Sequence, residues 1–542
     1  MTMKVCRRID SSLSTIASLL LLALSLAAAP VHGAIPASER DALDSLYLIT
    51  EGDSWNDATG WNGPAGTECD WYGVACDAAE TTVIGLDLEG NNLQEAIPYE
   101  LANLPNLFLL DLSNNQLGGA IPPELGSLTE LRELYLSAND LSGEIPPELG
   151  NLTALQRLTL SNNALTGPIP PELGNLSALQ QLYANGNALS GSIPAELGNL
   201  TALSILSLAD NELSGSIPAS LGGLGSLTQL DFGTNHLSGP IPPELANLGA
   251  IVLLDLSDND LSGPIPPELG NLPAIERLYL GKNALSGSIP PELGNLTGLR
   301  SLTLAWNRLT GPIPPEIGNL TGLTYLTLAG NVLIGEVPGE ITALTALSDG
   351  WGLLIGYNAV HTTDATVDAF LDQKAGTSWD ATQTVAPVNL TAGQGTVCSV
   401  RLDWDQVVFT NRAGGYTVEW ATAPGGPWHE AAVRVPSKTT TALEVTGLAA
   451  GTTHFFRVRT TTSPHQYNVN TVVSEPSAVV SATTAASGNL MSGDADGNGS
   501  VEAADLDAVL GYLFVPSPAV RPDINCDGVA DALDVADLLG LL

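Results

Sequence analysis

Apolar residues return in the same order every 24 residues over a long central part of the chain. The pattern runs from Leu107 to Ala346 in ten units without an insertion, and a further unit over residues 83–106 precedes them. In the unit "LQRLTLSNNALTGPIPPELGNLSA", the segment "LQRLTL" alternates apolar and polar residues, which predicts a strand with one buried face. A sustained period of this length indicates a solenoid in which each unit forms one coil.

Two further positions of the unit have structural explanations. An asparagine, Asn163 in the quoted unit, recurs in every coil. Because a side-chain amide both donates and accepts hydrogen bonds, we expect this buried column to satisfy backbone groups at the turn of each coil. The segment "IPPEL" predicts a short helical turn, since proline suits the first helical position and a carboxylate complements the helix dipole. We therefore interpret Glu172 and its equivalents as structural rather than as catalytic or metal-binding carboxylates.

These units resemble the plant-type leucine-rich repeat, with the consensus LxxLxLxxNxLxGxIPxxLxxL. The resemblance implies an α/β solenoid with one parallel strand per repeat on the concave face and short helical turns on the other side. Eleven repeats over residues 83–346 would give a sheet roughly 50 Å long at about 4.8 Å per strand. A surface of that length suits a protein or polymer ligand better than a metabolite. Asn358 indicates a degenerate repeat, and we expect this repeat and a C-terminal cap to occupy residues 347–386.

The preceding residues, 34–82, are predicted to cover the front of the solenoid. The segment "SERDALDSLYLI" predicts an amphipathic helix that opens with a capping box from Ser38 to Asp41. Cys69 and Cys76 are close enough in sequence to form a disulfide in an oxidising compartment, whereas Cys398 and Cys526 are expected to be buried thiols. The paired cysteines together with Trp71 resemble the N-terminal cap of plant leucine-rich repeat proteins.

The positions between the strand leucines are predicted to face solvent and to carry the specificity of the solenoid. Exposed aromatic side chains are effective contact anchors for a protein or a glycan, although tyrosine is also simply tolerated on an exposed strand. The candidate contact residues are Tyr135, Arg157, Tyr183, Asp231, Asp255, Tyr279, Tyr325 and Trp306, the last of which lies just beyond its strand.

Residues 387–484 change character and predict a small all-β sandwich. Alternating runs such as "VRLDWDQVVF", "GYTVEWATA" and "HFFRVRTTT" are separated by glycine-rich turns. The region resembles a fibronectin type III domain through Trp404, "GYTVEW" and "GLAAGTTHFFRV", with His454 in the place of the usual corner tyrosine. The resemblance implies a spacer module.

Residues 491–542, after a short linker over residues 485–490, contain two acidic loops that predict calcium binding. The loops "DADGNGSVEAAD" and "DINCDGVADALD" begin 29 residues apart. Each places oxygen donors at loop positions one, three, five, seven and twelve and glycine at six, which is the spacing that a hard cation requires. We therefore predict two calcium ions. Their expected ligands are Asp494, Asp496, Asn498, Ser500 and Asp505 in the first loop, and Asp523, Asn525, Asp527, Val529 and Asp534 in the second.

Aspartate at position twelve and two loop–helix units in tandem resemble a dockerin domain. The resemblance implies a small all-α module that folds around calcium, docks a cohesin-type partner and comes from a bacterium. Ala503, Ala504, Ala532 and Leu533 replace the hydroxyl pairs that dockerins often use for recognition. A calcium-stabilised terminal domain without a partner is the alternative interpretation.

The charge and the N-terminus restrict the possible partners and location. Lys and Arg number 18 against 58 Asp and Glu, so the net charge of −40 argues against nucleic acid or an anionic membrane as a partner. Residues 1–33 combine a basic start with an apolar run, which predicts a signal peptide cleaved after Gly33 or Ala34. No later segment has the length of a membrane span. We expect a secreted protein, with cell-surface association as a further possibility.

No motif predicts catalysis. The six histidines are scattered over unrelated modules, and the sequence contains neither a nucleophile elbow nor a phosphate-binding loop. The prediction is a secreted, non-enzymatic recognition or adhesion protein whose solenoid binds a protein or glycan and whose tail docks in a calcium-dependent way. The alternative is an accessory or inhibitor protein of an extracellular polysaccharide-degrading system built on cohesins and dockerins.

Overall fold

The computed structural model describes residues 34–376, 379–393 and 398–485. The predicted signal peptide, residues 486–490 of the linker, both calcium loops and Cys526 lie outside the described residues. The described chain divides into two compact units. The first ends at Leu237 and also includes Asn247–Ile251, and the second takes Ser238–Ala246 and the residues from Val252 onward.

Each coil contributes one short strand to a first parallel sheet, as the alternating pattern predicts. In β8 (Arg157–Thr159), the central leucine is buried while its two neighbours are half-buried. Successive strands pair residue by residue at a distance of one repeat, so Leu158 lies beside Leu182. The antiparallel strand β1 (Val74–Cys76) pairs with β2. The first unit holds β2 (Val83–Asp87), β4 (Leu109–Asp111), β6 (Glu133–Tyr135), β8, β10 (Gln181–Tyr183), β12 (Ile205–Ser207) and β14 (Gln229–Asp231); the second holds β16 (Leu253–Asp255), β18 (Arg277–Tyr279), β20 (Ser301–Thr303), β22 (Tyr325–Thr327) and β24 (Leu353–Leu354).

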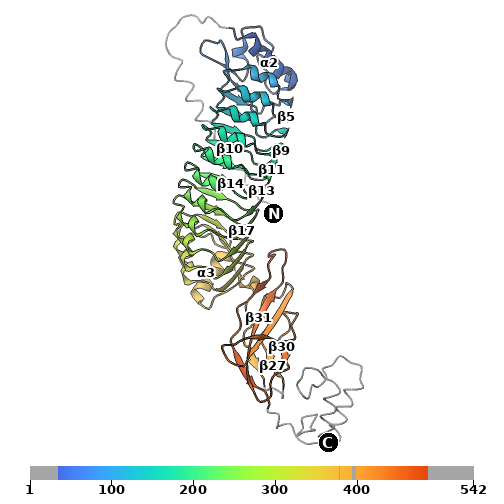
Figure 1. Cartoon of the computed structure of the whole chain (residues 1–542), viewed down its shortest axis with the longest axis vertical. Helices are drawn as coiled ribbons and strands as arrows, with labels where there is room; N and C mark the ends of the chain where they lie inside the picture. The colour runs from blue at the N-terminus through green and yellow to red at the C-terminus, as the bar shows by residue number, and fades with distance from the viewer. Residues whose placement is uncertain (1–33, 377–378, 394–397, 486–542) are drawn as a thin grey trace, which may run out of the picture. The chain divides into compact units, whose positions relative to one another are not determined.

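Besides the predicted strand, each repeat contains a second parallel strand, which follows the asparagine turn and was not predicted. The segment "ALTGP" of β9 (Ala164–Pro168) has a single buried residue, Leu165, and therefore shows no alternation from which a strand could be predicted. Its equivalents pair in parallel with one another and form a second sheet (Figure 1). Its strands are β3 (Gln94–Ala96), β5 (Gln116–Gly119), β7 (Asp140–Gly143), β9, β11 (Ala188–Ser192) and β13 (Glu212–Gly215) in the first unit, β15 (His236–Gly239) at the division, and β17 (Asp260–Pro264), β19 (Ala284–Gly287), β21 (Arg308–Gly311), β23 (Val332–Glu336) and β25 (Ala359–His361) in the second.

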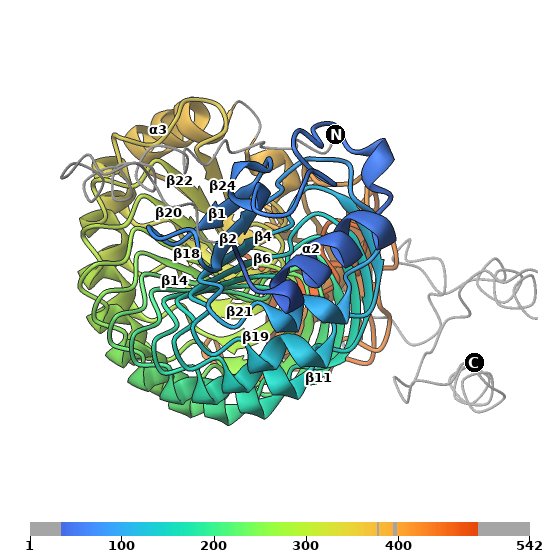
Figure 2. The same cartoon turned by 90° about the horizontal axis from the view of Figure 1, so that it is seen from above.

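The predicted helical turns are present as short 3₁₀ helices. In η6 (Pro171–Asn175), proline opens the turn and Leu173 is buried. The glycine that follows is required by stacking, because a Cβ atom at Gly174 would lie 2.5 Å from the carbonyl oxygen of Glu196 in the next coil. Figure 2 shows these turns on the outer side of the coils of the first unit, with β4 and β6 inside. The turns are η3 (Tyr99–Asn103), η4 (Pro123–Ser127), η5 (Pro147–Asn151), η6, η7 (Ala195–Asn199), η8 (Ala219–Gly223), η9 (Pro243–Asn247), η10 (Pro267–Asn271), η11 (Pro291–Asn295), η12 (Pro315–Asn319) and η13 (Gly339–Ala343).

The asparagine column satisfies backbone groups at the turns, as predicted. The amide of Asn211 donates to the carbonyl oxygens of Ala184 and Leu208, both at 3.0 Å, and its Oδ1 accepts the backbone N–H of Leu189 at 3.0 Å. One side chain therefore links two successive coils. The residue that precedes the asparagine adopts a left-handed backbone conformation, including Asp210 (φ 53°) and even Trp306 (φ 55°). This conformation is costly for a bulky residue, so the hydrogen bonds of the column must offset its cost.

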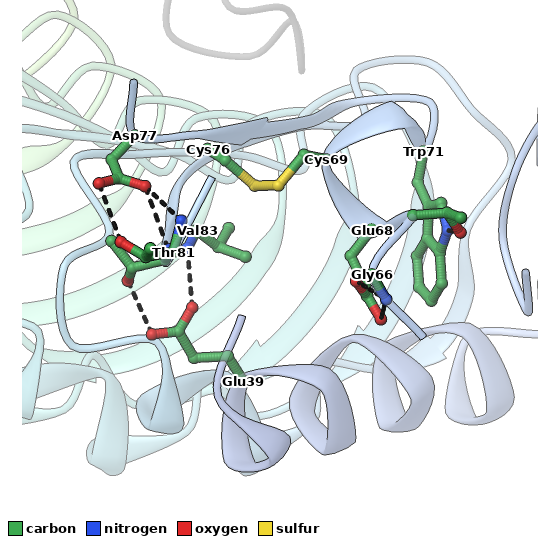
Figure 3. Close-up of a disulfide and its surroundings, with 11 residues drawn as sticks. Glu39, Gly66, Glu68, Cys69, Trp71, Cys76, Asp77, Thr81 and Val83 are labelled. Atoms are coloured by element: carbon green, nitrogen blue, oxygen red, sulfur yellow. Dashed lines mark hydrogen bonds between the residues drawn. A yellow bond between two sulfur atoms is a disulfide. The ribbon is translucent and has the colours of Figure 1, made fainter. Parts of the chain in front are cut away.

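The front of the solenoid carries the predicted helix and disulfide but not the predicted capping box. Helix α2 (Ala37–Ile49) has Pro36 at its N-cap and no side-chain capping bond. The carboxylate of Glu39 in its first turn instead accepts the backbone N–H of Val83 and the hydroxyl of Thr82, each at 2.7 Å (Figure 3). These bonds satisfy the first strand of the sheet, so Glu39 links the helix to the solenoid. The short turns η1 (Gly52–Ser54) and η2 (Glu68–Asp70) follow, and Cys69 is bonded to Cys76 as predicted.

The rear of the solenoid has the predicted degenerate coil and helix. Asn358 continues the column three residues out of register and accepts the N–H of Leu333 at 3.1 Å. Helix α3 (Ala365–Ala375) is capped by Asp364 and buries Val367 and Leu371. The ammonium group of Lys374 is also buried and donates to the carbonyl oxygen of Leu347 at 2.9 Å. The turn η14 (Asp380–Thr382) follows.

The residues from 387 form a strand-rich region with two antiparallel sheets. Trp404, Tyr416, Val418 and Phe456 belong to one buried core that both sheets enclose. Cys398, predicted to be a buried thiol, is only half-buried. One sheet contains β26 (Thr391–Ala392), β27 (Val400–Asp403) and β30 (Ala442–Val445); the other contains β28 (Gly414–Ala421), β29 (His429–Glu430), β31 (Thr453–Thr462), β32 (Val472–Val473) and β33 (Val480–Thr483).

Removing one amide of the asparagine column is expected to destabilise the solenoid. In Asn211→Ala, three buried backbone groups lose their partner, and each such loss costs about 1–3 kcal/mol before relaxation. We expect the free energy of unfolding to fall by about 2–4 kcal/mol, measured by urea denaturation. Asn199→Ala removes an exposed asparagine from the neighbouring turn and is expected to have little effect. Equal effects of the two substitutions would contradict the proposed role of the column.

Candidate binding face on the first sheet

The candidate contact residues other than Trp306 lie on the first sheet in two columns that flank the buried leucines. The first column holds the residue before each leucine, such as Glu133, Arg157 and Gln181, and the second holds the residue after it. In the second column Tyr135, Thr159 and Tyr183 are direct neighbours on successive strands. The three-residue strands position these side chains, because a buried leucine fixes the orientation of both its neighbours.

The structure brings Tyr135, Arg157 and Tyr183 together with a fourth residue, Glu133, that sequence reasoning missed. The phenol of Tyr135 donates to Glu133 Oε2 at 2.8 Å. One guanidinium nitrogen of Arg157 lies 3.3 Å from the Tyr135 oxygen and 3.5 Å from Glu133 Oε1. We call these four residues the Tyr135 cluster. Glu133 could have been found from the register, since it lies one repeat before Arg157.

Burial sets the protonation of the phenols in the Tyr135 cluster. It is the main cause that raises the pKa of Tyr135 to about 12, and the charge of Glu133 acts in the same direction while Arg157 opposes it. Burial likewise raises the pKa of Tyr183. Both rings therefore remain neutral phenols at physiological pH, able to donate and accept hydrogen bonds. With one guanidinium and one carboxylate beside them, they form a polar surface with an aromatic base.

The carboxylates of the aspartates in the second column accept hydrogen bonds from residues of their own coils. Asp111 Oδ1 accepts the backbone N–H of Ser113 at 2.9 Å and its hydroxyl at 2.6 Å. Asp255, on β16, makes the same bonds with Ser257, at 2.9 Å and 2.5 Å. Asp231 accepts the N–H of Gly233 at 3.3 Å. These carboxylates thus stabilise the turn after the strand.

The three aromatic candidates of the second unit do not form one cluster. Tyr279 lies in the second column, Tyr325 lies in the first column two strands further on, and Trp306 lies in the turn after β20. Tyr325 packs instead against Trp351, with 6.2 Å between ring centroids. Trp351 is 61% exposed, and sequence reasoning missed it because the degenerate coil is out of register there.

Other parts of the described chain offer no stronger site. A cleft of about 750 Å³ in the second unit is lined by His361, Asp364, Trp379, Glu475 and their neighbours, but by none of the predicted contact residues. Within the described ranges, no group of three or more His, Cys, Asp or Glu side chains is arranged to hold a metal ion. None of the helices described is both long enough and apolar enough to cross a membrane.

Comparisons with known proteins identify the repeats. Residues 86–237 match a family model described as a leucine-rich repeat region, and residues 251–272, 274–296 and 298–320 match the Leucine Rich Repeat model. These parts of the chain are therefore leucine-rich repeats, as predicted. The sequence matches none of the curated proteins compared with it.

Solved structures with the same repeat solenoid include plant receptor ectodomains. The Arabidopsis receptor kinase HAESA, solved in complex with the peptide hormone IDA and the co-receptor SERK1, is 36% identical and has a TM-score of 0.53; the match covers 60% of this chain and 54% of that one. The PEPR1–AtPEP1 structure is 32% identical with a TM-score of 0.52, covering 58% and 48%. The chain thus spans about half the length of these proteins.

The pKa of Asp111 predicts a pH-dependent stability of the first unit. Burial is the main cause that raises this pKa from 3.8 to about 6. Since the unfolded chain releases this proton at lower pH than the folded chain, the carboxylate should lower the free energy of unfolding as pH rises from about 4 to 6. Asp111→Asn keeps an acceptor for Ser113 but cannot ionise. We expect it to be about 1–2 kcal/mol more stable than the wild type above pH 6 and equal to it below pH 4.

Urea denaturation at a series of pH values measures this difference. Asp140→Asn, which alters an exposed aspartate at the start of β7, is the matched control and should not reproduce the effect. A constant offset between Asp111→Asn and the wild type at every pH would show that the carboxylate is not the cause.

Proposed function

We propose that the chain is a secreted, non-enzymatic recognition protein whose first sheet binds a polypeptide. The observation that carries the proposal is the Tyr135 cluster. It places neutral phenols, a guanidinium and a carboxylate on adjacent strands, where an extended chain crossing the sheet would meet donors and acceptors at every repeat. Tyrosine and arginine are also the residues that most often dominate binding energy.

The similarity to receptor ectodomains supports a polypeptide ligand over a glycan. The similar receptor kinase HAESA was solved with a peptide hormone and a co-receptor bound. A glycan remains the other ligand class that aromatic side chains on a sheet can bind. The two ligand classes differ in charge. A peptide offers charged termini to Arg157 and Glu133, whereas a neutral glycan offers no charged group.

The strand-rich region and the tail complete the proposal. We infer that the strand-rich region is a fibronectin type III spacer and that the tail is a dockerin-like module that takes two calcium ions. The support is the spacing of the two acidic loops at Asp494 and Asp523. A cohesin-type partner and a bacterial source rest on the same resemblance. If the tail does dock a cohesin, the chain would serve as an accessory or inhibitor protein of a polysaccharide-degrading system, which is the second candidate function.

Substitution of the two phenol-bearing residues is expected to abolish target binding. Tyr135→Ala with Tyr183→Ala removes the two neutral phenols and the aromatic base of the Tyr135 cluster. Each hot-spot residue contributes about 2 kcal/mol or more, so the loss of both should lower the affinity by a factor on the order of a thousand. Targets would be captured from the secreted and surface fraction of the source organism, identified by mass spectrometry, and titrated against both proteins by calorimetry.

Glu148→Ala with Glu196→Ala changes two exposed carboxylates on the 3₁₀ side of the same coils and serves as the control. The proposal predicts that this control binds like the wild type. Unchanged binding by the tyrosine variant would show that recognition does not use this face. Capture of oligosaccharides instead of polypeptides would replace the proposed ligand class.

The tail is expected to bind two calcium ions per chain. Asp494→Ala with Asp523→Ala removes the position-one ligand of both loops, which should abolish binding in a calcium titration followed by calorimetry. Asp507→Ala, which alters an aspartate two residues beyond the first loop, is the control and should retain two sites. Two sites in the loop variant would contradict the assignment of these ligands.

A further inference from the structure

A hairpin of the strand-rich region, Ser463–Asn470, bonds directly to the last coils of the solenoid within the second unit. We call it the latch segment. The amide of Asn468 donates to the backbone oxygens of Asn331 at 2.8 Å and Tyr357 at 2.7 Å. The amide of Asn470 donates to the backbone oxygen of Asn307 at 2.6 Å. Three successive coils are thus tied to residues more than a hundred positions later in the chain.

Both the nitrogen and the oxygen of the Asn468 side-chain amide form hydrogen bonds at this contact. The residue is 1% exposed, and its Oδ1 accepts the backbone N–H of Asn470 at 2.9 Å. Its amide links two successive coils from outside, just as each column asparagine links them from inside. Loss of a buried, fully paired amide is costly, so this side chain specifies where the hairpin sits.

Four aromatic rings pack together at the latch segment, and two of them belong to it. Tyr357 of the last coil stacks on Tyr467, with 5.2 Å between centroids and 16° between planes. His465 meets Tyr357 edge-on at 5.5 Å, and Phe409 lies 6.2 Å from both. Tyr357 adopts a left-handed backbone conformation, with φ at 59°. This is the conformation of the residue that precedes each column asparagine, here Asn358, so it belongs to the repeat and places the Tyr357 ring beside the latch segment.

A second contact lies beside the rings. The hydroxyls of Thr384 and Thr462 are buried and 2.6 Å apart, which joins the residues after the solenoid cap to the end of β31. Thr462 also accepts a bond from the buried ammonium of Lys438 at 2.6 Å. Lys438 donates further to the carbonyl oxygen of Phe409 at 3.0 Å, so the cation is held under the ring cluster.

The surroundings of His465 favour its neutral form. Its Nδ1 accepts the backbone N–H of Tyr467 at 3.2 Å, and a proton on Nδ1 would remove that bond. The charged groups that face it are both cations, Arg412 and Lys438, and the remaining neighbours are the phenols of Tyr357 and Tyr467 and the ring of Phe409.

We propose that the latch segment is an acid-sensitive clasp, which holds the strand-rich region against the last three coils when His465 is neutral and releases it when His465 is protonated. The device would set whether the modules after the solenoid move with the repeats or independently of them. This inference does not depend on what the first sheet binds.

The direction of the pH effect follows from the environment of His465. Burial, followed by the charges of Arg412 and Lys438, lowers its pKa below the ordinary value of 6.5. The docked form therefore takes up a proton less readily than the released form. Docking is fully stable above pH 6.5 and weakens as pH falls below that value, until His465 is protonated in both forms.

A second histidine at the same junction opposes this effect. His361 Nε2 lies 3.3 Å from Glu336 and 3.9 Å from Glu475, one carboxylate on the solenoid and one on the strand-rich region. A protonated His361 would attract both. His361→Gln removes this attraction and should make the acid response larger, which separates the two contributions.

The test measures the distance between the two modules in the full chain. Spin labels on non-natural residues at two exposed positions, Glu292 and Val433, would be read by double electron–electron resonance at pH 7.5 and pH 5.0. We expect one narrow distance distribution at pH 7.5 and a broad additional population at pH 5.0 that reverses on neutralisation. Asn468→Ala should give the broad population already at pH 7.5.

His465→Phe retains an aromatic ring that cannot be protonated and should give the narrow distribution at both pH values. His429→Phe changes an exposed histidine in β29 and should respond to acid like the wild type. Near-ultraviolet circular dichroism would confirm that each variant is folded. A narrow distribution at both pH values in the wild type, or an unchanged acid response in His465→Phe, would overturn the switch; a broad wild-type distribution at pH 7.5 would overturn the clasp itself.

Discussion

The hydrogen bonds of the asparagine column are the constraint on which the repeats depend. Each coil must turn between its two strands inside a packed stack, where no water is available for its backbone groups. One amide, such as that of Asn211, supplies two donors and one acceptor and so closes a turn and joins it to the preceding coil. The period of 24 residues, the left-handed residue before each asparagine and the glycine that lets the 3₁₀ turns stack all follow from repeating that geometry without change.

The repeat period, the buried leucines and the column were predictable because each recurs and therefore stands out against variable positions. The second sheet was not, since segments such as Ala164–Pro168 contain one apolar residue and take their strand conformation from neighbouring coils. The same holds for Glu39, whose role at the first strand depends on a partner 44 residues away. The candidate face was predictable as a list of positions. Which of them meet depends on register, which joins Tyr135 to Arg157 but separates Tyr279 from Tyr325.

Polar side chains on the face of the first sheet cost free energy in this fold, because they are partly removed from water. Most of its strands are three residues long and closely stacked, so polar side chains beside the buried leucines lose part of their hydration. That loss keeps Tyr135 a neutral phenol and raises the pKa of Asp111 to about 6. The hydroxyl and N–H of Ser113 limit the cost for Asp111, and Arg157 limits it for Tyr135. Polar groups that are already partly dehydrated lose less hydration on contact with a ligand, so the desolvation cost of binding is smaller. This favours the face as a binding surface.

The ends of a solenoid need donors that its own coils cannot supply. At the front, the backbone N–H of Asn56 donates to the carbonyl oxygen of Asn91 at 3.0 Å, and its side-chain amide donates to Gly90 at 2.8 Å. At the rear, Asn468 and Asn470 donate to the same class of carbonyl, that of the column asparagines. The front donor belongs to the cap of the solenoid, whereas the rear donors belong to a different fold. The rear end is therefore completed by a contact with a separate fold that has its own buried core, which is the physical condition for the proposed clasp.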